Sequence, residues 1–315
     1  MATPKGPAAW PALPYASWSE TCEALHLWLQ LVGKVRLSLT PWVNHSWHAT
    51  YYVTARGLTT STMWSGRQAL EVAFDFLTNS LELRTSRGAL VRLPLESQSV
   101  ADFRAGLLRA LHELDIDVDL NDTPNEVPDA IPFSRDHETR RFDAASAERF
   151  WRVLLQVDRV FRRFRTGFVG KVSPVHLFWG SLDLAVTRFS GRPAPPHPGG
   201  IPHLPDTVTR EAYSHEVSSA GFWPGDKSGH DASFYSYAYP EPEGFRDAKV
   251  EPAGARYDEA LREFVLPYEV VRTAPDPDAT LLAFLETTYG AAAALGGWDR
   301  SLECALGQLG VPRVV

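Results

Sequence analysis

The tetrapeptide Val32-Gly-Lys-Val35 recurs later in the chain as Val169-Gly-Lys-Val172. Each copy closes a run of apolar residues at helical spacing, and each is followed by segments that contain Trp and His. Downstream of each copy a Val-Thr pair precedes an arginine, in Val53-Thr-Ala-Arg56 and in Val186-Thr-Arg188. Because these features recur in the same order, the sequence predicts an internal duplication.

The same succession of elements is predicted around each copy, namely a helix, antiparallel strands and a closing helix. Helical periodicity covers residues 18–35, 100–114, 146–168 and 278–295. Aromatic and β-branched residues predict strands at 47–55, 69–77, 81–93, 174–189, 209–219, 233–239 and 263–268. We therefore expect an α+β fold of two such halves, residues 1–121 and 139–315, joined by a Pro-spaced linker at 122–138, with a pocket between the halves.

Composition and charge exclude several classes of protein. The 315 residues are 44% hydrophobic and 22% charged, which excludes wholesale disorder and a membrane bundle. The net charge of −7 argues against a nucleic-acid partner. No apolar run is long enough to span or anchor in a membrane, and Cys22 and Cys304 are too few for a disulfide framework. These features predict a cytoplasmic protein with a small-molecule ligand, and they leave its oligomeric state open.

Histidine is the main candidate for chemistry, because the usual phosphate-loop, dinucleotide, serine-hydrolase and zinc-protease motifs are missing from the sequence. His176, His215 and Glu216 are the candidate catalytic residues. His45, His48, His176 and His215 are the candidate ligands of a divalent transition metal, since imidazole is a common ligand of such ions. The alternative is that each histidine is buried and hydrogen-bonded to the backbone.

Two arginines at matched positions, Arg56 and Arg188, are candidates for binding an anionic substrate, because guanidinium groups suit carboxylates and phosphates. The alternative is a structural ion pair for each arginine inside its own half. Asp183 is a candidate partner for such an arginine or for a histidine.

Aromatic side chains suggest the walls of a pocket. Trp179, Tyr235 and Tyr237 are the candidate binding residues, and the alternation in 234–239 places the tyrosines on one face of a strand and Phe234 on the other. Core packing is the alternative for most of these rings. The Pro-rich segment 191–205 cannot form a helix, and we expect a loop that covers the pocket as a lid.

Three long runs resemble an uncharacterised bacterial family of unknown function: Pro174-Val-His-Leu-Phe-Trp-Gly-Ser-Leu-Asp-Leu-Ala-Val-Thr-Arg188, Tyr213-Ser-His-Glu-Val-Ser-Ser-Ala-Gly-Phe-Trp-Pro224 and Phe234-Tyr-Ser-Tyr-Ala-Tyr-Pro-Glu-Pro-Glu-Gly-Phe245. The resemblance covers nearly the whole chain. It implies one shared architecture and transfers no catalytic residue.

Together these patterns predict a small-molecule enzyme, with a His-based hydrolase or lyase favoured, either metal-dependent or not, acting on a small anionic substrate. A non-haem oxygenase that uses two histidines and Glu216 is also compatible with the residues. The first alternative is a non-catalytic protein that binds a metabolite in an aromatic-lined cleft. The second is a partner-binding protein whose tyrosine stripe forms an interface.

Overall fold

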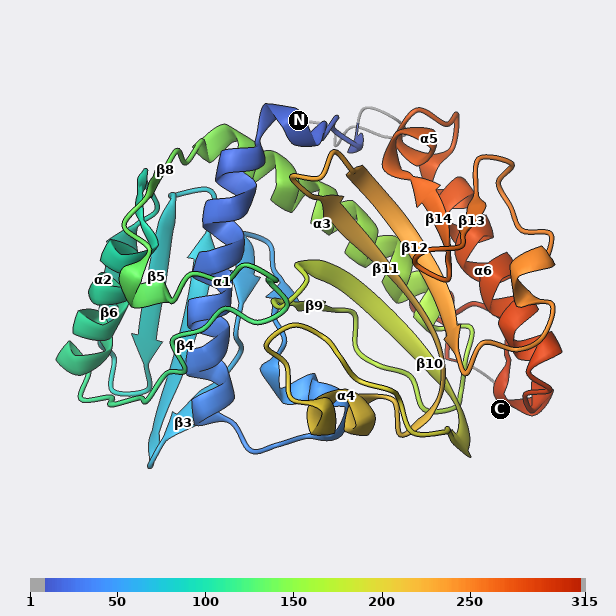
Figure 1. The fold of residues 1–315 in the computed structure, drawn as a ribbon, viewed down its shortest axis with the longest axis horizontal. Coiled ribbons are helices and arrows are strands. Elements are labelled where there is room, and N and C mark those ends of the chain that lie inside the picture. The colour runs from blue at the N-terminus through green and yellow to red at the C-terminus, as the bar shows by residue number, and fades with distance from the viewer. Residues whose placement is uncertain (1–8, 313–315) are drawn as a thin grey trace.

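The computed structural model describes residues 9–312, which form two antiparallel sheets with helices packed against them (Figure 1). This confirms a mixed α+β class. The first sheet has the strand order β1-β2-β4-β5-β6, and β3 pairs with β4. Its strands are β1 (Tyr52–Val53), β2 (Gly57–Thr59), β3 (Met63–Ser65), β4 (Gln68–Asp75), β5 (Ser80–Thr85) and β6 (Leu90–Pro94).

Two helices belong with the first sheet, α1 (Ser19–Leu39) and α2 (Val100–Glu113). Figure 1 shows α1 lying across one face of this sheet. The helix is buried over most of its length, and Trp28 stacks on Phe103 of α2 with ring centroids 4.9 Å apart. Helix α2 begins at a cap, where the side chain of Ser99 accepts the backbone N–H of Asp102. A short ribbon of β7 (Gln98–Ser99) and β8 (Thr139–Arg140) joins this region to the rest of the chain.

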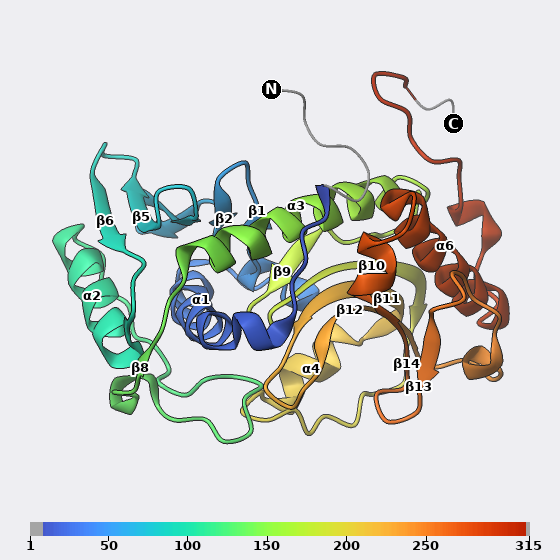
Figure 2. The ribbon, with the colours of Figure 1, turned by 90° about the horizontal axis from the view of Figure 1, so that it is seen from above.

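The second sheet has the order β13-β14-β12-β11-β10-β9. Its strands are β9 (His176–Phe178), β10 (Asp183–Pro193), β11 (His215–Gly225), β12 (Asp231–Tyr239), β13 (Arg256–Asp258) and β14 (Glu263–Pro267). The helices of this region are α3 (Ala144–Arg165), α4 (Asp206–Ala212), α5 (Tyr268–Arg272) and α6 (Pro277–Leu295). Figure 2 shows α3 extending from the first sheet to α6, so the helix packs against both sheets.

Alternation along the strands gives the second sheet two different faces. Leu184, Phe222 and Phe234 are fully buried beneath α3, α5 and α6, where Phe234 contacts Phe161 of α3 and Tyr268 of α5. The residues between them point to the opposite face, which these helices leave uncovered. That face carries the site described below.

Within residues 9–312 one backbone bridge joins the two sheets. Tyr51, just before β1, and Leu177 in β9 exchange two backbone hydrogen bonds, each with an N···O distance of 2.9 Å. The two sheets differ in order, because β14 lies between β12 and β13 whereas β4, β5 and β6 are neighbours in sequence order. The internal duplication and the domain limits 1–121, 122–138 and 139–315 stay predictions.

Four predicted strands are wrong in part. The predicted strands 81–93 and 174–189 are each divided by a turn, into β5 and β6 and into β9 and β10. Residues 44–49 form a 3₁₀ segment, and within the predicted strand 47–55 the structure has Tyr51 in a bridge and Tyr52–Val53 as a strand. His45 and Ser46 have φ values of 60° and 57°, a left-handed conformation that no strand contains. In the predicted strand 209–219 the first residues instead belong to α4, which begins directly after Pro205. No helix among residues 9–312 is both long and apolar enough to cross a membrane.

Candidate functional site

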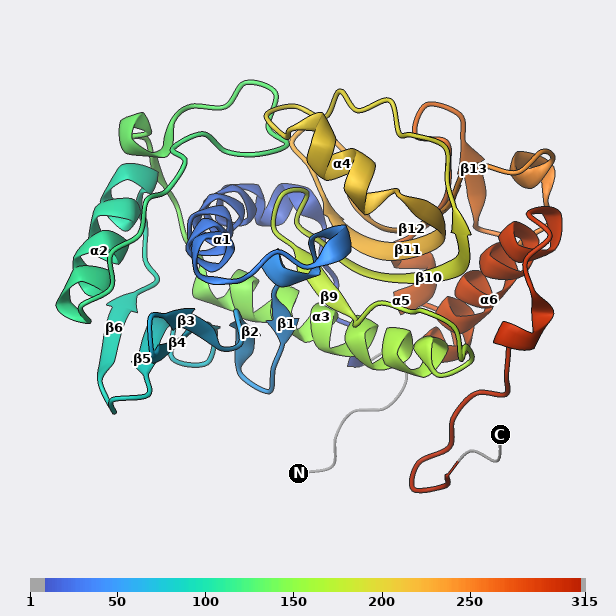
Figure 3. The ribbon, with the colours of Figure 1, turned by 90° about the horizontal axis from the view of Figure 1, so that it is seen from below.

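A cleft of about 1310 Å³ lies on the uncovered face of the second sheet. Alternate residues of β10, from Asp183 to Phe189, form its floor together with Tyr235 and Tyr237 of β12. Figure 3 shows α4 on the side of β10–β12 that is opposite α3. The other walls come from the end of α1, the 3₁₀ segment Asn44–Ala49, residues around Glu126, and the end of the Pro-rich loop.

Asp183 is the most deeply placed acid of the cleft, with 7% of its surface exposed. Its Oδ1 atom accepts a hydrogen bond of 2.5 Å from Oγ of Ser181, and its Oδ2 atom accepts one from the hydroxyl of Tyr235. Burial raises the pKa of the Asp183 carboxyl, and the hydrogen bonds from Ser181 and Tyr235 oppose that shift. The carboxylate is therefore buried, and two side-chain hydroxyl groups donate hydrogen bonds to it.

Glu126 approaches Asp183 from the segment between α2 and β8. Burial, together with the negative charge of Asp183, raises the pKa of Glu126 to about 7. The hydroxyl of Ser181 contacts this carboxyl as well as that of Asp183. One hydroxyl therefore links two carboxyl groups, one of which is half-protonated near neutral pH.

The backbone around Glu126 is anchored on both sides. The Glu126 N–H donates to the carbonyl of Pro202 at 2.8 Å, which ties it to the Pro-rich loop. The preceding residue, Asn125, donates its N–H to Gln30 Oε1 at 2.8 Å, and its side-chain Oδ1 accepts from Lys34 Nζ at 2.5 Å. Glu126 itself has a left-handed φ of 61°. Contacts distant in sequence thus fix where this carboxyl lies.

A third acid, Glu263 of β14, lines the same cleft. Burial raises its pKa to about 7, with further contributions from the charges of Asp183 and Asp258. Asp258 of β13 is its direct cross-strand partner. Three electrostatically coupled carboxyl groups, those of Glu126, Asp183 and Glu263, therefore face one space, and we refer to them as the acidic triad.

Tyrosines surround the acidic triad. The hydroxyls of Tyr213 and Tyr237 are 2.7 Å apart, and the rings of Tyr235 and Tyr237 are stacked with centroids 6.0 Å apart. The Tyr235 ring crosses β11 at Gly221, where a Cβ atom would lie 2.3 Å from the ring. Glycine at this position is what lets the Tyr235 hydroxyl reach Asp183.

Six of the residues predicted from sequence line this cleft, and five do not. The lining residues among them are His45, His48, Trp179, Asp183, Tyr235 and Tyr237, and Asp183 is paired with Ser181 and Tyr235 rather than with the expected arginine or histidine. The residues outside the lining are Arg56, Arg188, His176, His215 and Glu216.

The two arginines lie in unlike surroundings, although the sequence matched them. Arg56 is exposed in the turn between β1 and β2 and pairs with Asp75 at 2.5 Å. Arg188 is buried on the helix-covered face of β10, with its guanidinium 3.6 Å from the ring centroid of Phe164. The structure does not bring these two arginines together around one anion.

The four histidines do not converge on a common point. His45 donates from Nδ1 to the carbonyl of Ala212 at 2.7 Å, so its Nε2 is the acceptor that lies 2.6 Å from Lys171 Nζ. His176 is 1% exposed next to the hydroxyl of Thr50, and burial lowers its pKa to about 3. Across residues 9–312 no three His, Cys, Asp or Glu side chains are spaced to hold a metal ion.

His48 and His215 are placed on different segments. His48 contacts Trp42 in a tilted arrangement with ring centroids 4.5 Å apart, and burial lowers the pKa of His48. His215 starts β11 with its ring centroid 6.1 Å from that of His45. The rings of His45 and His215 are therefore neighbours, whereas the ring of His48 lies against Trp42.

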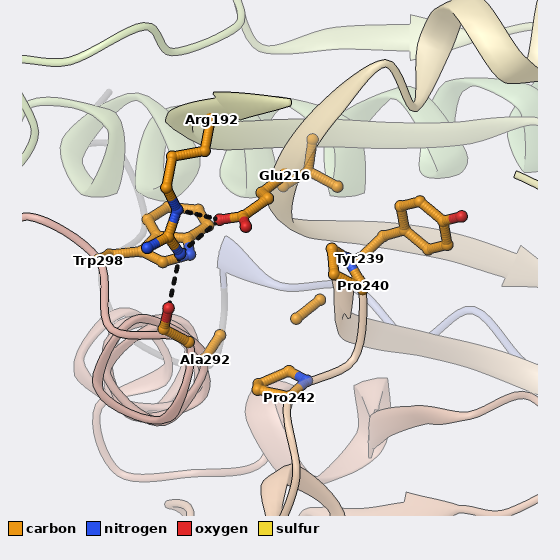
Figure 4. A pocket seen from close by; sticks show the side chains of 10 residues that line it. Arg192, Glu216, Tyr239, Pro240, Pro242, Ala292 and Trp298 are labelled. Atoms are coloured by element: carbon orange, nitrogen blue, oxygen red, sulfur yellow. Dashed lines mark hydrogen bonds and ion pairs between the residues drawn. The ribbon is translucent and has the colours of Figure 1, made fainter. Parts of the chain in front are cut away.

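Glu216 lies in a separate hollow of about 120 Å³ (Figure 4). Its Oε2 accepts hydrogen bonds from Nε and Nη2 of Arg192, at 2.9 and 2.6 Å. The same guanidinium donates to the carbonyls of Gly296 and Gly297, just after α6. Glu216 therefore holds an arginine against the C-terminal end of a helix, where a cation is favourable.

Sequence reasoning missed Glu126, Ser181, Tyr213 and Glu263. The parity of the strands carried a usable signal, because Asp183 and Tyr235 fall on the same face as Tyr237. No such signal exists for Glu126, which lies in a Pro-spaced segment without periodicity.

A family model described as "Family of unknown function (DUF5996)" matches residues 10–304. No curated protein and no solved structure matches the chain.

Proposed function

Because the chain belongs to DUF5996, a family of unknown function, we propose its activity from the cleft: a small-molecule hydrolase or lyase that works by carboxyl acid–base catalysis. The observation that carries the proposal is the pair Glu126 and Asp183, linked by Ser181 at the floor of a large cleft. A general acid works best when its pKa is near the working pH, and the pKa of Glu126 is about 7.

The two carboxyl groups are suited to opposite roles. Protonated Glu126 donates a proton to the leaving group. Asp183, whose ionised form is favoured by hydrogen bonds from Tyr235 and Ser181, accepts a proton from water in a hydrolysis or from a substrate carbon in an elimination. Burial raises the pKa of both carboxyl groups, but Asp183 receives two hydrogen bonds that oppose the shift, which favours Asp183 as the base of the pair.

This proposal keeps the small-molecule enzyme expected from sequence and changes the residues that perform it. His176 and Glu216 lie outside the cleft, and His176 is too deeply buried to exchange protons with a substrate. We also propose that the end of the Pro-rich loop forms a wall over the substrate, since Ile201, His203 and Leu204 line the cleft.

The test compares a metabolite extract incubated with wild type, Glu126→Gln and Asp183→Asn, followed by untargeted mass spectrometry. We expect compounds that wild type consumes and that either variant consumes at least about 100-fold more slowly. Glu243→Gln, a change at an exposed glutamate, is the matched control and should behave as wild type.

His215→Gln should retain activity within a few fold, because His215 does not line the cleft. The rate with the consumed compound should fall above pH 7, as Glu126 loses its proton. If wild type consumes nothing, or if both carboxyl variants stay fully active, the proposal is wrong, and binding without turnover would support the non-catalytic alternative.

A further inference from the structure

We infer that the cleft selects a positively charged ligand, an organic ammonium ion, and that Glu263 with Asp258 forms the subsite for its cationic group. This rests on the cleft assigned above and names the class of its substrate. It differs from the anionic substrate that the sequence suggested.

The charges that line the cleft are predominantly negative. Its lining acids are Glu126, Asp183, Asp226, Asp231, Asp258 and Glu263. The lysines and arginines of the lining are Lys34 and Arg256, and neither forms an ion pair with a residue in the described part of the chain. Lys34 Nζ instead bonds Asn125 and lies 5.6 Å from the ring centroid of Trp179.

Four histidines also line the cleft, namely His45, His48, His203 and His230. Burial lowers the pKa values of His45 and His48, so both are neutral at physiological pH. His230 is paired with Asp226 at 3.0 Å, at the end of β11 and β12. An anionic ligand would therefore meet an excess of carboxylates.

Glu263 and Asp258 occupy directly opposed positions of β13 and β14. Like charges at opposed positions of a strand pair destabilise a sheet. Glu263 forms no ion pair within residues 9–312, although it lies mostly buried in the cleft. A cation bound between these two side chains would remove the repulsion and supply the missing counter-charge.

Two further features of the walls suit an ammonium ion. Trp179, Tyr235 and Tyr237 line the same space, and aromatic rings attract cations. On the opposite wall, Thr209 of α4 is 2% exposed, and its Oγ1 has no hydrogen-bond partner in the part of the chain that the structure describes. Thr209 is one of the lining residues of the cleft, so its unused hydroxyl is an acceptor beside this space.

The experiment uses three probes that share one ring and differ in charge: 2-phenylethylammonium, 2-phenylethanol and phenylacetate. Calorimetric titration of the full chain at pH 8 should show the ammonium ion binding at least about tenfold more tightly than the alcohol, and phenylacetate binding most weakly. Glu263→Gln should weaken binding of the ammonium ion at least about fivefold and leave the affinity for the alcohol unchanged. Glu243→Gln should change neither affinity.

Affinity for the ammonium ion should also rise from pH 6 to pH 8, as Glu126 and Glu263 ionise, and titrations in two buffers of different ionisation enthalpy should show proton release. The inference is wrong if phenylacetate binds as tightly as the ammonium ion or more tightly. It is also wrong if none of the three probes binds at concentrations up to about 10 mM, or if Glu263→Gln leaves the affinity for the ammonium ion unchanged.

The outcomes separate the two proposals. Selective ammonium binding without any consumed metabolite supports this inference and contradicts acid–base catalysis. Consumption of neutral or anionic compounds that depends on Glu126, without ammonium selectivity, contradicts this inference alone.

Discussion

The carboxyl group of Glu126 fills the space that a side chain on Gly180 would need: a Cβ atom at residue 180 would lie 1.8 Å from Oε1 of Glu126. Gly180 is in turn held by His26, whose Nε2 lies 2.8 Å from the Gly180 carbonyl oxygen and 3.0 Å from that of Trp179. A partly buried histidine in α1 thus positions the turn that contacts the proposed general acid.

Gly180→Ala should move the Glu126 carboxyl away from Asp183, because a flexible side chain yields more readily than the backbone. The φ of Gly180 is not in the left-handed region, so alanine fits the backbone there. We expect this variant to lose turnover as Glu126→Gln does, with a change in unfolding free energy of about 1 kcal/mol. Gly290→Ala in α6, where a Cβ would meet nothing within 4 Å, is the control and should retain activity. Full activity of Gly180→Ala would show that the contact does not position Glu126.

Glu126→Gln should make the protein more stable than wild type at alkaline pH. The folded-state pKa of about 7 exceeds the ordinary value of 4.5, so ionising Glu126 costs stability as the pH rises through this window. Above pH 7 the variant should exceed wild type by up to about 3 kcal/mol, and the difference should shrink toward pH 4.5. Urea unfolding at pH 5 and pH 8.5, followed by tryptophan fluorescence, measures this. The prediction is wrong if the unfolding free energies of wild type and Glu126→Gln change with pH by the same amount. The control Glu243→Gln should show the pH dependence of wild type.

Tyr235→Phe should destabilise the protein by about 1–3 kcal/mol at pH 8, because a buried carboxylate loses a hydrogen-bond donor. The pKa of Asp183 should rise further in this variant. Tyr239→Phe removes a hydroxyl that bonds the carbonyl of Pro195 at an exposed position, so its effect should stay below about 1 kcal/mol. Equal losses in both variants would show that the Tyr235 hydroxyl contributes no more than a surface hydrogen bond.

His176→Asn should flatten the acid limb of the stability profile. Folding lowers the pKa of His176 from 6.5 to about 3, so wild type loses stability as the pH falls below 6.5 and the unfolded chain takes up the proton. Asparagine keeps a polar atom near Thr50 and does not titrate. Between pH 6.5 and pH 5 the variant should lose about 2 kcal/mol less than wild type, whatever its stability at neutral pH. His112→Asn, at an exposed site on α2, should keep the slope of wild type.

Local periodicity predicted α1, α2, α3 and α6 to within a few residues, because their apolar faces repeat at helical spacing. The same reasoning correctly placed Tyr235 and Tyr237 opposite Phe234. It failed at residues 47–49, which continue the 3₁₀ segment that begins at Asn44. In this segment the backbone N–H of His45 donates to the carboxylate of Glu211 on α4, at 2.9 Å. That contact joins residues 166 apart and leaves no local pattern.

In the candidate site, too, local patterns predicted some residues, while positions that depend on contacts distant in sequence were not predicted. Strand alternation placed the tyrosines, but the matched Val-Thr-Arg pattern could not reveal that Arg188 lies beneath the sheet while Arg56 lies in an exposed turn. Glu126 depends on Gly180, Pro202 and Gln30 acting through Asn125. Such non-local support becomes visible only when the chain is folded.

The hydrogen bonds between Tyr51 and Leu177 have a consequence for self-association. These residues sit at the outer edges of β1 and β9, where each sheet would otherwise present unpaired N–H and C=O groups. Unpaired edges are templates on which a second molecule can add a strand and begin aggregation. Because the two edges hydrogen-bond to each other, one contact protects both of them from strand addition. Any opening between the sheets would expose two unpaired strand edges at once.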